Sequence, residues 1–68
     1  MEIFCKRLKE LRVENEYTQK SLAEKLNTTN SAVCDWEKGR TQPDLETLRK
    51  IATFFDVKTD YLLGLSDD

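Results

Sequence analysis

The sequence predicts an all-α fold, a compact domain of five short helices. Apolar residues recur at spacings of three and four residues, which is the period of amphipathic helices. Residues that cap helices stand between the apolar stripes, and only two glycines and one proline are present, so little of the chain is irregular. A chain of 68 residues builds one core. We therefore expect one domain over residues 1–65 and a short, frayed acidic tail over residues 66–68.

The first helix is expected from Ile3 to Glu14. Phe4, Leu8 and Leu11 stand at positions i, i+4 and i+7, so they form one apolar stripe along it. Charged side chains cover its other faces. This pattern predicts that the stripe contributes to the core.

Two short helices with a tight corner between them organise the centre of the chain. Thr18 is the expected N-cap of the first, and Asn27 ends it because Asn tolerates the left-handed conformation. Thr29 caps the second, which we expect from Asn30 to Glu37. The apolar residues expected on the two inner faces are Leu22, Ala23, Leu26, Val33 and Trp36. Two helices joined in this way form the unit that places its second helix in the DNA major groove.

Two further helices complete the chain. Gly39 ends the third helix and Asp44 caps the fourth. The fourth helix carries an apolar stripe made of Leu45, Leu48, Ile51, Ala52 and Phe55. Thr59 is the expected cap of a last short helix over Asp60–Leu63, which Gly64 closes.

The charge of the chain argues mildly against nucleic acid as a partner. The net charge is −2 and the sequence pI is about 5.1, whereas phosphate contacts need Lys and Arg. Residues 1–55, however, hold ten basic and nine acidic residues, and residues 56–68 hold one lysine and four aspartates. The acidic excess is therefore concentrated at one end, and binding depends on the face that meets the DNA.

The residues that most enzymes and metal sites need are missing. The sequence has no histidine, no phosphate-binding glycine loop and no nucleophile beside a base, and Cys5 and Cys34 stand alone. No signal peptide or membrane-spanning pattern is present. We expect a cytoplasmic protein that is not an enzyme and has no metal and no cofactor.

These elements together resemble the Cro/repressor-type helix-turn-helix family of bacteria and their phages, also called the xenobiotic-response-element family. The segments that carry the resemblance are RLKELR at 7–12, TQKSLAEKL at 18–26, VCDWEKG at 33–39, PDLETL at 43–48 and LLG at 62–64. The resemblance implies a lambda-repressor-like fold with its helix-turn-helix at the second and third helices. It also implies a nucleoid-associated transcriptional regulator, a homodimeric repressor that binds an inverted-repeat operator in double-stranded DNA.

The resemblance implies that the third helix reads bases through Asn30, Ser31 and Asp35. Asparagine bonds adenine in a bidentate manner, and serine bonds several bases. Asp35 has three readings: it accepts from cytosine N4, it pairs locally with Lys38, or it rejects wrong sequences. Cys34 lies on the same face, as a small residue beside a sugar or a thymine methyl group.

Contacts with the DNA backbone are expected on both sides of the third helix. Gln19, in the first turn of its helix, lies beside exposed N–H groups and the positive end of the helix dipole, which suit a phosphate. The full expected set is Thr18, Gln19, Thr29, Lys38, Arg40, Thr41 and Gln42.

Other residues are expected to support the third helix or to join two copies of the chain. Arg12 and Glu37 match a family pair that bridges the first helix to the end of the third, while Ala23, Val33 and Trp36 fix its geometry. The dimer candidates are Phe54, Tyr61, Leu62 and Leu65.

An alternative function is a protein-interaction module that keeps the fold without binding DNA, or the antitoxin of a toxin–antitoxin pair. The acidic pI favours this alternative, and a regulatory protein is then the expected partner. Salt dependence distinguishes the two functions, because binding to phosphates weakens steeply with salt.

Overall fold

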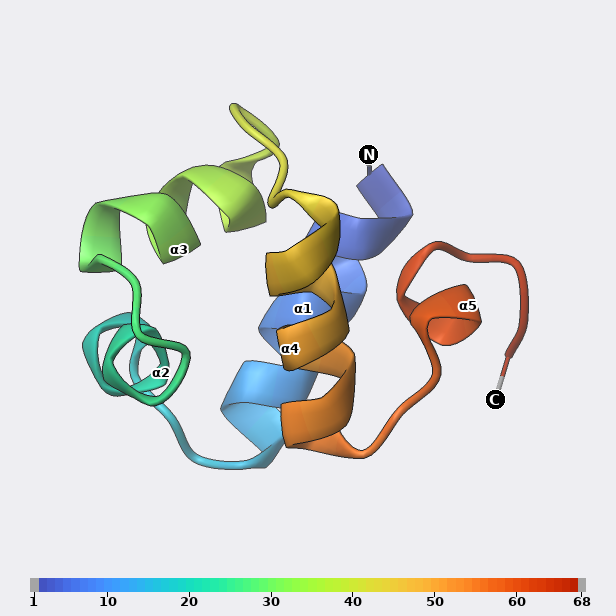
Figure 1. Ribbon diagram of the computed structural model, residues 1–68, viewed down its shortest axis with the longest axis horizontal. Helices are drawn as coiled ribbons and strands as arrows, with labels where there is room; N and C mark the ends of the chain where they lie inside the picture. The colour runs from blue at the N-terminus through green and yellow to red at the C-terminus, as the bar shows by residue number, and fades with distance from the viewer. Residues whose placement is uncertain (1, 68) are drawn as a thin grey trace.

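A computed structural model describes residues 2–67, which form five helices and no strand (Figure 1). The helices are α1 (Glu2–Glu14), α2 (Gln19–Lys25), α3 (Asn30–Lys38), α4 (Leu45–Phe55) and α5 (Thr59–Leu62). In Figure 1, α1 and α4 lie at the centre, with α2 and α3 on one side and α5 on the other. The prediction of a five-helix, all-α domain is confirmed.

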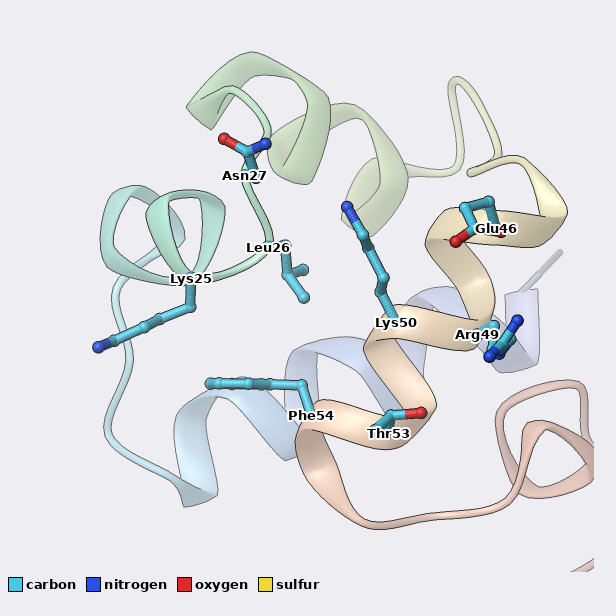
Figure 2. Close-up of a pocket in the computed structure, with 8 residues that line it drawn as sticks. All are labelled: Lys25, Leu26, Asn27, Glu46, Arg49, Lys50, Thr53 and Phe54. Carbon is cyan, nitrogen blue, oxygen red and sulfur yellow. The ribbon is translucent and has the colours of Figure 1, made fainter.

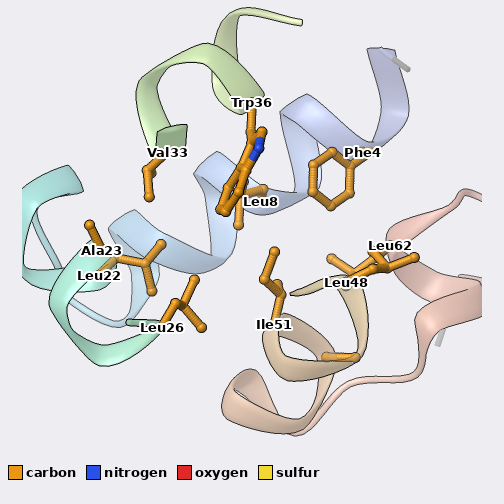
Figure 3. Close-up of a cluster of buried hydrophobic side chains, with 11 residues drawn as sticks. Phe4, Leu8, Leu22, Ala23, Leu26, Val33, Trp36, Leu48, Ile51 and Leu62 are labelled. Carbon is orange, nitrogen blue, oxygen red and sulfur yellow. The ribbon is translucent and has the colours of Figure 1, made fainter. Parts of the chain in front are cut away.

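A single apolar core joins the five helices (Figure 3). Its buried members are Phe4, Leu8, Leu22, Ala23, Leu26, Val33, Trp36, Leu48, Ile51, Ala52 and Leu62. The five residues expected on the inner faces of the two central helices are all among them. Trp36 is 6% exposed, so its large ring is core, as its spacing from Val33 predicts. Each large side chain buried in this way contributes about 1.5–3 kcal/mol.

The predicted caps form as expected around the central helices. Thr18, Thr29 and Asp44 each accept a hydrogen bond from the backbone N–H three residues later, at 3.0, 3.1 and 2.9 Å. Asn27 and Gly39 end their helices in the left-handed conformation, with φ of 57° and 76°. These local signals therefore determine where α2, α3 and α4 begin and where α2 and α3 end.

Two predictions for α4 and α5 are wrong. Leu45 was expected in the apolar stripe, but it is 85% exposed, whereas Leu48, three residues later, is buried in the core. The last helix is Thr59–Leu62, not Asp60–Leu63, and its N-cap is Lys58 rather than Thr59. The backbone N–H groups of Tyr61 and Leu62 both donate to the Lys58 carbonyl, so the first turn closes one residue earlier.

The predicted frayed tail is also wrong for Ser66 and Asp67. Arg7 on α1 donates to the backbone carbonyls of Tyr61 and Ser66, the latter at 2.7 Å, and its Nη2 lies 3.5 Å from the Asp67 carboxylate. The Arg7 guanidinium also lies over the Tyr61 ring, 4.2 Å from its centroid. Arg7 therefore holds the C-terminal segment against α1. Asp68, the last residue of the predicted tail, lies outside the described residues.

The α4 cap gives a pH-dependent prediction. Hydrogen bonding by Thr47, through its side chain and then its backbone N–H, lowers the pKa of Asp44 below the usual range. A lowered pKa in the folded state means that the carboxylate stabilises the fold above the unfolded-state pKa and that this contribution disappears as pH falls through the folded-state value. We expect Asp44→Ala to lower the urea midpoint at pH 7, and the difference from the parent to shrink at about pH 3.

Glu24→Ala is the control for this experiment, because Glu24 is an exposed acid on α2 that caps no helix. It should change the midpoint little at either pH. A difference between Asp44→Ala and the parent that stays constant from pH 7 to pH 3 would contradict the assignment.

Candidate nucleic-acid interface

The α2–α3 corner forms a rigid two-helix unit. Asn27 in its left-handed conformation reverses the chain after α2, and the Thr28 N–H donates to the Ala23 carbonyl at 2.8 Å. Ala23 is 2% exposed and Val33 is fully buried, so both fill the contact between the helices. The helix after the corner is thereby fixed with one face inward and one face outward.

The outward face of α3 carries the residues predicted to read bases. Asn30 and Ser31 are exposed, while Cys34 and Asp35 are half-buried one turn further along. These four positions follow the i, i+1, i+4, i+5 spacing of one helix face. The face therefore offers an amide, a hydroxyl and a carboxylate, which are groups that hydrogen-bond base edges.

Asp35 has an ion-pair partner that the sequence reasoning missed. The left-handed Gly39 turns the chain back so that the Arg40 N–H donates to the Asp35 carbonyl at 2.9 Å. This turn brings the two side chains together, with the Arg40 Nη1 3.6 Å from the Asp35 Oδ1. The local partner was expected to be Lys38, and the structure corrects it to Arg40. A helix-ending glycine followed by Arg was the available signal, since this turn places that residue beside the last helical turn.

A network of hydrogen bonds joins α1, α2 and α3 behind the outward face. Arg12 contacts Glu37 with two nitrogens, Nε to Oε2 at 2.6 Å and Nη2 to Oε1 at 3.1 Å. Its third nitrogen donates to the Tyr17 carbonyl at 2.9 Å. The Arg12 and Glu37 side chains are only 13% and 4% exposed. The predicted bridge is confirmed, and its burial distinguishes it from a weak surface pair.

Gln19 also belongs to this network. Its Nε2 donates to the Glu37 Oε1 at 3.2 Å, an interaction that the sequence did not predict. A carboxylate only accepts, so this contact determines which end of the Gln19 amide faces Glu37. The amide oxygen is left for another donor. The buried Glu37 therefore orients a side chain at the start of α2.

The other residues predicted to contact the DNA backbone lie at the two ends of α3 and at the start of α2. The exposed members of this set are Thr18, Thr29, Lys38, Arg40, Thr41 and Gln42. Thr18 and Thr29 also cap their helices, so their hydroxyls are held close to the first-turn N–H groups. Lys38 is the last residue of α3, and Arg40, Thr41 and Gln42 lie in the loop that follows it. The predicted contacts thus flank the outward face of α3 on both sides.

The predicted dimer residues separate into three kinds. Leu62 is fully buried against α1 and α4, so its prediction as a surface contact is wrong. Phe54 and Tyr61 are half-buried, Phe54 against Tyr17 with ring centroids 5.3 Å apart, and Tyr61 beneath Arg7. Leu65 is 75% exposed. The apolar side of α5 packs on α1 and α4 within the domain, so Leu62 is not available to a second copy of the chain.

The described residues contain neither a metal-binding cluster nor a membrane-spanning helix. Among residues 2–67, no three His, Cys, Asp or Glu side chains gather as a group that could hold a metal ion. Over the same part of the chain, no helix is long and apolar enough to cross a membrane.

Known proteins match this chain over most of its length. A family model described as "Helix-turn-helix" matches residues 8–62. The HTH-type transcriptional regulator ImmR of Bacillus subtilis (strain 168) is 49% identical over 59 residues, 87% of this chain and 46% of that protein. The immunity repressor protein of Bacillus phage phi105 is 36% identical over 58 residues, 85% of this chain and 40% of that protein. This chain therefore spans about half the length of these two relatives.

A relative of similar length and a solved structure also match. An uncharacterized HTH-type transcriptional regulator of Methanocaldococcus jannaschii is 37% identical over 62 residues, 91% of this chain and 94% of that protein. The P22 c2 repressor, solved in complex with synthetic operator 9T, has a TM-score of 0.86 and 25% identity. The match covers 93% of this chain and 96% of the repressor chain.

The Arg12–Glu37 bridge gives a prediction for stability. Arg12→Ala leaves the nearly buried Glu37 carboxylate without its cation, so we expect the free energy of unfolding to fall by about 3 kcal/mol. Lys9→Ala, which removes an exposed cation from the same helix, should change it by less than about 0.5 kcal/mol. Urea unfolding measures both.

The double variant Arg12→Ala/Glu37→Ala separates the charge from the packing. It removes the stranded carboxylate as well, so it should lose less stability than the sum of the two single variants. Additive losses, or equal losses for Arg12→Ala and Lys9→Ala, would contradict the structural role of the bridge.

Proposed function

The chain belongs to the helix-turn-helix family, and on that premise we propose that it is a sequence-specific, DNA-binding transcriptional regulator, acting as a repressor. The observation that carries this proposal is the polar outward face of α3 on a fold that matches a repressor solved with its operator. Related proteins named as transcriptional regulators and as an immunity repressor support it. We place its action in the cytoplasm, on nucleoid or phage DNA.

In the proposed complex, α3 enters the major groove with its N-terminal half toward the base edges. Asn30 and Ser31 are exposed there, and neither side chain is required by the core. An asparagine that bonds adenine N6 and N7 discriminates against other bases by about 1–3 kcal/mol. Cys34 and Asp35 follow one turn later, where Cys34 contacts a sugar or a thymine methyl group.

Phosphate contacts on both sides of α3 fix its position. Thr18, Gln19 and Thr29 approach one strand, with the Gln19 amide already oriented by Glu37. Lys38 and Arg40, followed by Thr41 and Gln42, run along the other strand as a loop. Glu37 itself faces Arg12 rather than solvent, so its negative charge is neutralised inside the protein. The surface that meets DNA is therefore less acidic than the net charge of the chain suggests.

We propose further that the protein acts as a homodimer. One domain of this size reads only a few base pairs, and two copies related by a two-fold axis read inverted half-sites about 34 Å apart. The exposed Leu65 is the strongest member of the predicted dimer set, with the half-buried Tyr61 on the neighbouring α5. Occupying a promoter is enough for repression, so no catalysis is needed.

The bases read by α3 can be identified by selecting bound duplexes from a random pool. We expect Asn30→Ala and Ser31→Ala each to lose preference at one position of a half-site, and to bind the parent's selected duplex about 5–100-fold more weakly. Thr53→Ala, an exposed polar residue on α4, is the matched control and should select the parent sequence. An unchanged selected sequence for both α3 variants would overturn the assignment of α3 as the reader.

The Asp35–Arg40 pair predicts a coupled salt dependence on non-specific duplex DNA. Each cation that engages a phosphate steepens the fall of log K with log salt by about 0.9. Asp35 competes with phosphate for Arg40, so Arg40 is only partly engaged with DNA in the parent. Arg40→Ala should therefore reduce the steepness of log K against log salt by clearly less than about 0.9. In an Asp35→Asn background, where Arg40 is released, the same change should reduce the slope by about 0.9.

Lys38→Ala is the control, since Lys38 is exposed on the same helix end and forms no ion pair recorded among residues 2–67. Its effect on the slope should be the same in both backgrounds. Equal effects of Arg40→Ala in both backgrounds would show that Asp35 does not restrain Arg40. A parent protein with no salt-sensitive binding to any duplex would favour the protein-interaction module instead.

A further inference from the structure

An open groove lies between the end of α2 and one side of α4 (Figure 2). Its volume is about 400 Å³. Lys25 lines it from α2, and Arg49 and Lys50 line it from α4, with Leu26 and Phe54 between the two sides in Figure 2. We call this surface the basic groove. It combines apolar side chains at its centre with cations along its edges.

The apolar centre of the basic groove is held rigidly. Leu26 is 4% exposed and belongs to the core. The Phe54 ring packs against two other aromatic rings, with centroids 5.3 Å from Tyr17 and 5.1 Å from Phe55. A side chain fixed in this way loses little freedom when a ligand binds against it. The groove is therefore largely formed before any partner arrives.

The cations of the basic groove form no ion pair with another side chain among residues 2–67. The ion pairs recorded among residues 2–67 involve Arg7, Arg12 and Arg40, and none involves Lys25, Arg49 or Lys50. One acid, Glu46, lines the groove with these three cations, and the Asp44 carboxylate at the start of α4 interacts with Lys50 from outside the lining. The groove thus carries a local charge of +2 on a chain whose net charge is −2. This charge is complementary to an acidic ligand.

The basic groove is separate from the proposed DNA interface. The proposed DNA contacts lie at the start of α2, along α3 and in the loop after it, and none of them lines the groove. The groove instead uses the end of α2 and one side of α4. A DNA backbone would match the cations but would leave the exposed part of the half-buried Phe54 without an apolar partner. An acidic segment with apolar anchors matches both features.

We propose that the basic groove binds an acidic, amphipathic segment of a partner protein. Apolar side chains of the segment pack on Phe54 at the groove centre, and its carboxylates face Lys25, Arg49 and Lys50. This interaction is independent of DNA binding, because the outward face of α3 stays accessible while the groove is occupied. The small groove predicts a weak, transient contact that charge makes faster to form.

The test uses the full chain labelled with ¹⁵N and a synthetic twelve-residue peptide that alternates glutamate with leucine and phenylalanine. We expect its binding to shift the amide signals of Leu26, Asn27 and Thr53. Arg49→Glu/Lys50→Glu should weaken binding at least tenfold. Lys6→Glu/Lys9→Glu is the matched control, since it reverses two exposed cations on α1. It should bind the peptide within about twofold of the parent, because only the overall charge of the protein changes.

Three results would overturn the proposal. The first is equal weakening by the α1 and α4 charge reversals, which would show attraction without a site. The second is unchanged binding of a peptide in which alanine replaces leucine and phenylalanine. The third is a loss of duplex affinity and salt slope in Arg49→Ala/Lys50→Ala, which would make the groove a phosphate contact. The peptide titration contains no DNA, so failure of the proposed DNA binding leaves its outcome unaffected.

Discussion

The contact of Arg12 with Glu37 sets the position of the helix on which the proposed function depends. All three nitrogen groups of Arg12 are engaged, two with Glu37 and one with the Tyr17 carbonyl. Because the pair is almost fully removed from solvent, neither partner can leave without stranding the other charge. Gln19 donates to the same carboxylate, so the start of α2 and Arg12 on α1 both hydrogen-bond Glu37 near the end of α3. The relative position of the groups proposed to face phosphates and bases depends on these shared hydrogen bonds.

The two faces of α3 divide structure from recognition. Val33 and Trp36 point inward and are determined by the core, so the outward positions are free to vary without loss of the fold. The end of the helix is less independent, because Gly39 returns the chain and brings Arg40 beside Asp35. An acid on the outward face of α3, which is proposed to read bases, therefore lies beside a cation of the following loop. We infer that this pair contributes to specificity by restraining a phosphate-binding charge.

The distribution of charge is compatible with the acidic ligands that we propose for this acidic chain. Glu37 and Asp35 each face an arginine, and Asp67 lies near Arg7, so part of the negative charge is balanced locally. Among residues 2–67, Lys38 at the end of α3 and the cations of the basic groove take part in none of these ion pairs. The net charge describes neither of these surfaces, since screening limits its reach to about 8–10 Å at physiological salt.

The sequence alone determined the helices, most of their caps and the identity of the inner and outer faces of the α2–α3 unit. These features depend on neighbours within four residues, as in the bond from the Ala32 N–H to Thr29 and in the left-handed Asn27. The tertiary structure decided which apolar side chains are buried, because burial depends on how the helices pack on one another. Leu45 at the start of α4 is exposed, while Leu62 at the end of α5 is fully buried. Both are leucines at a helix end, so their local sequence does not distinguish them. The contact of Arg7 with the C-terminal segment and the assembly of the basic groove join residues far apart in the chain, and no local period encodes such contacts.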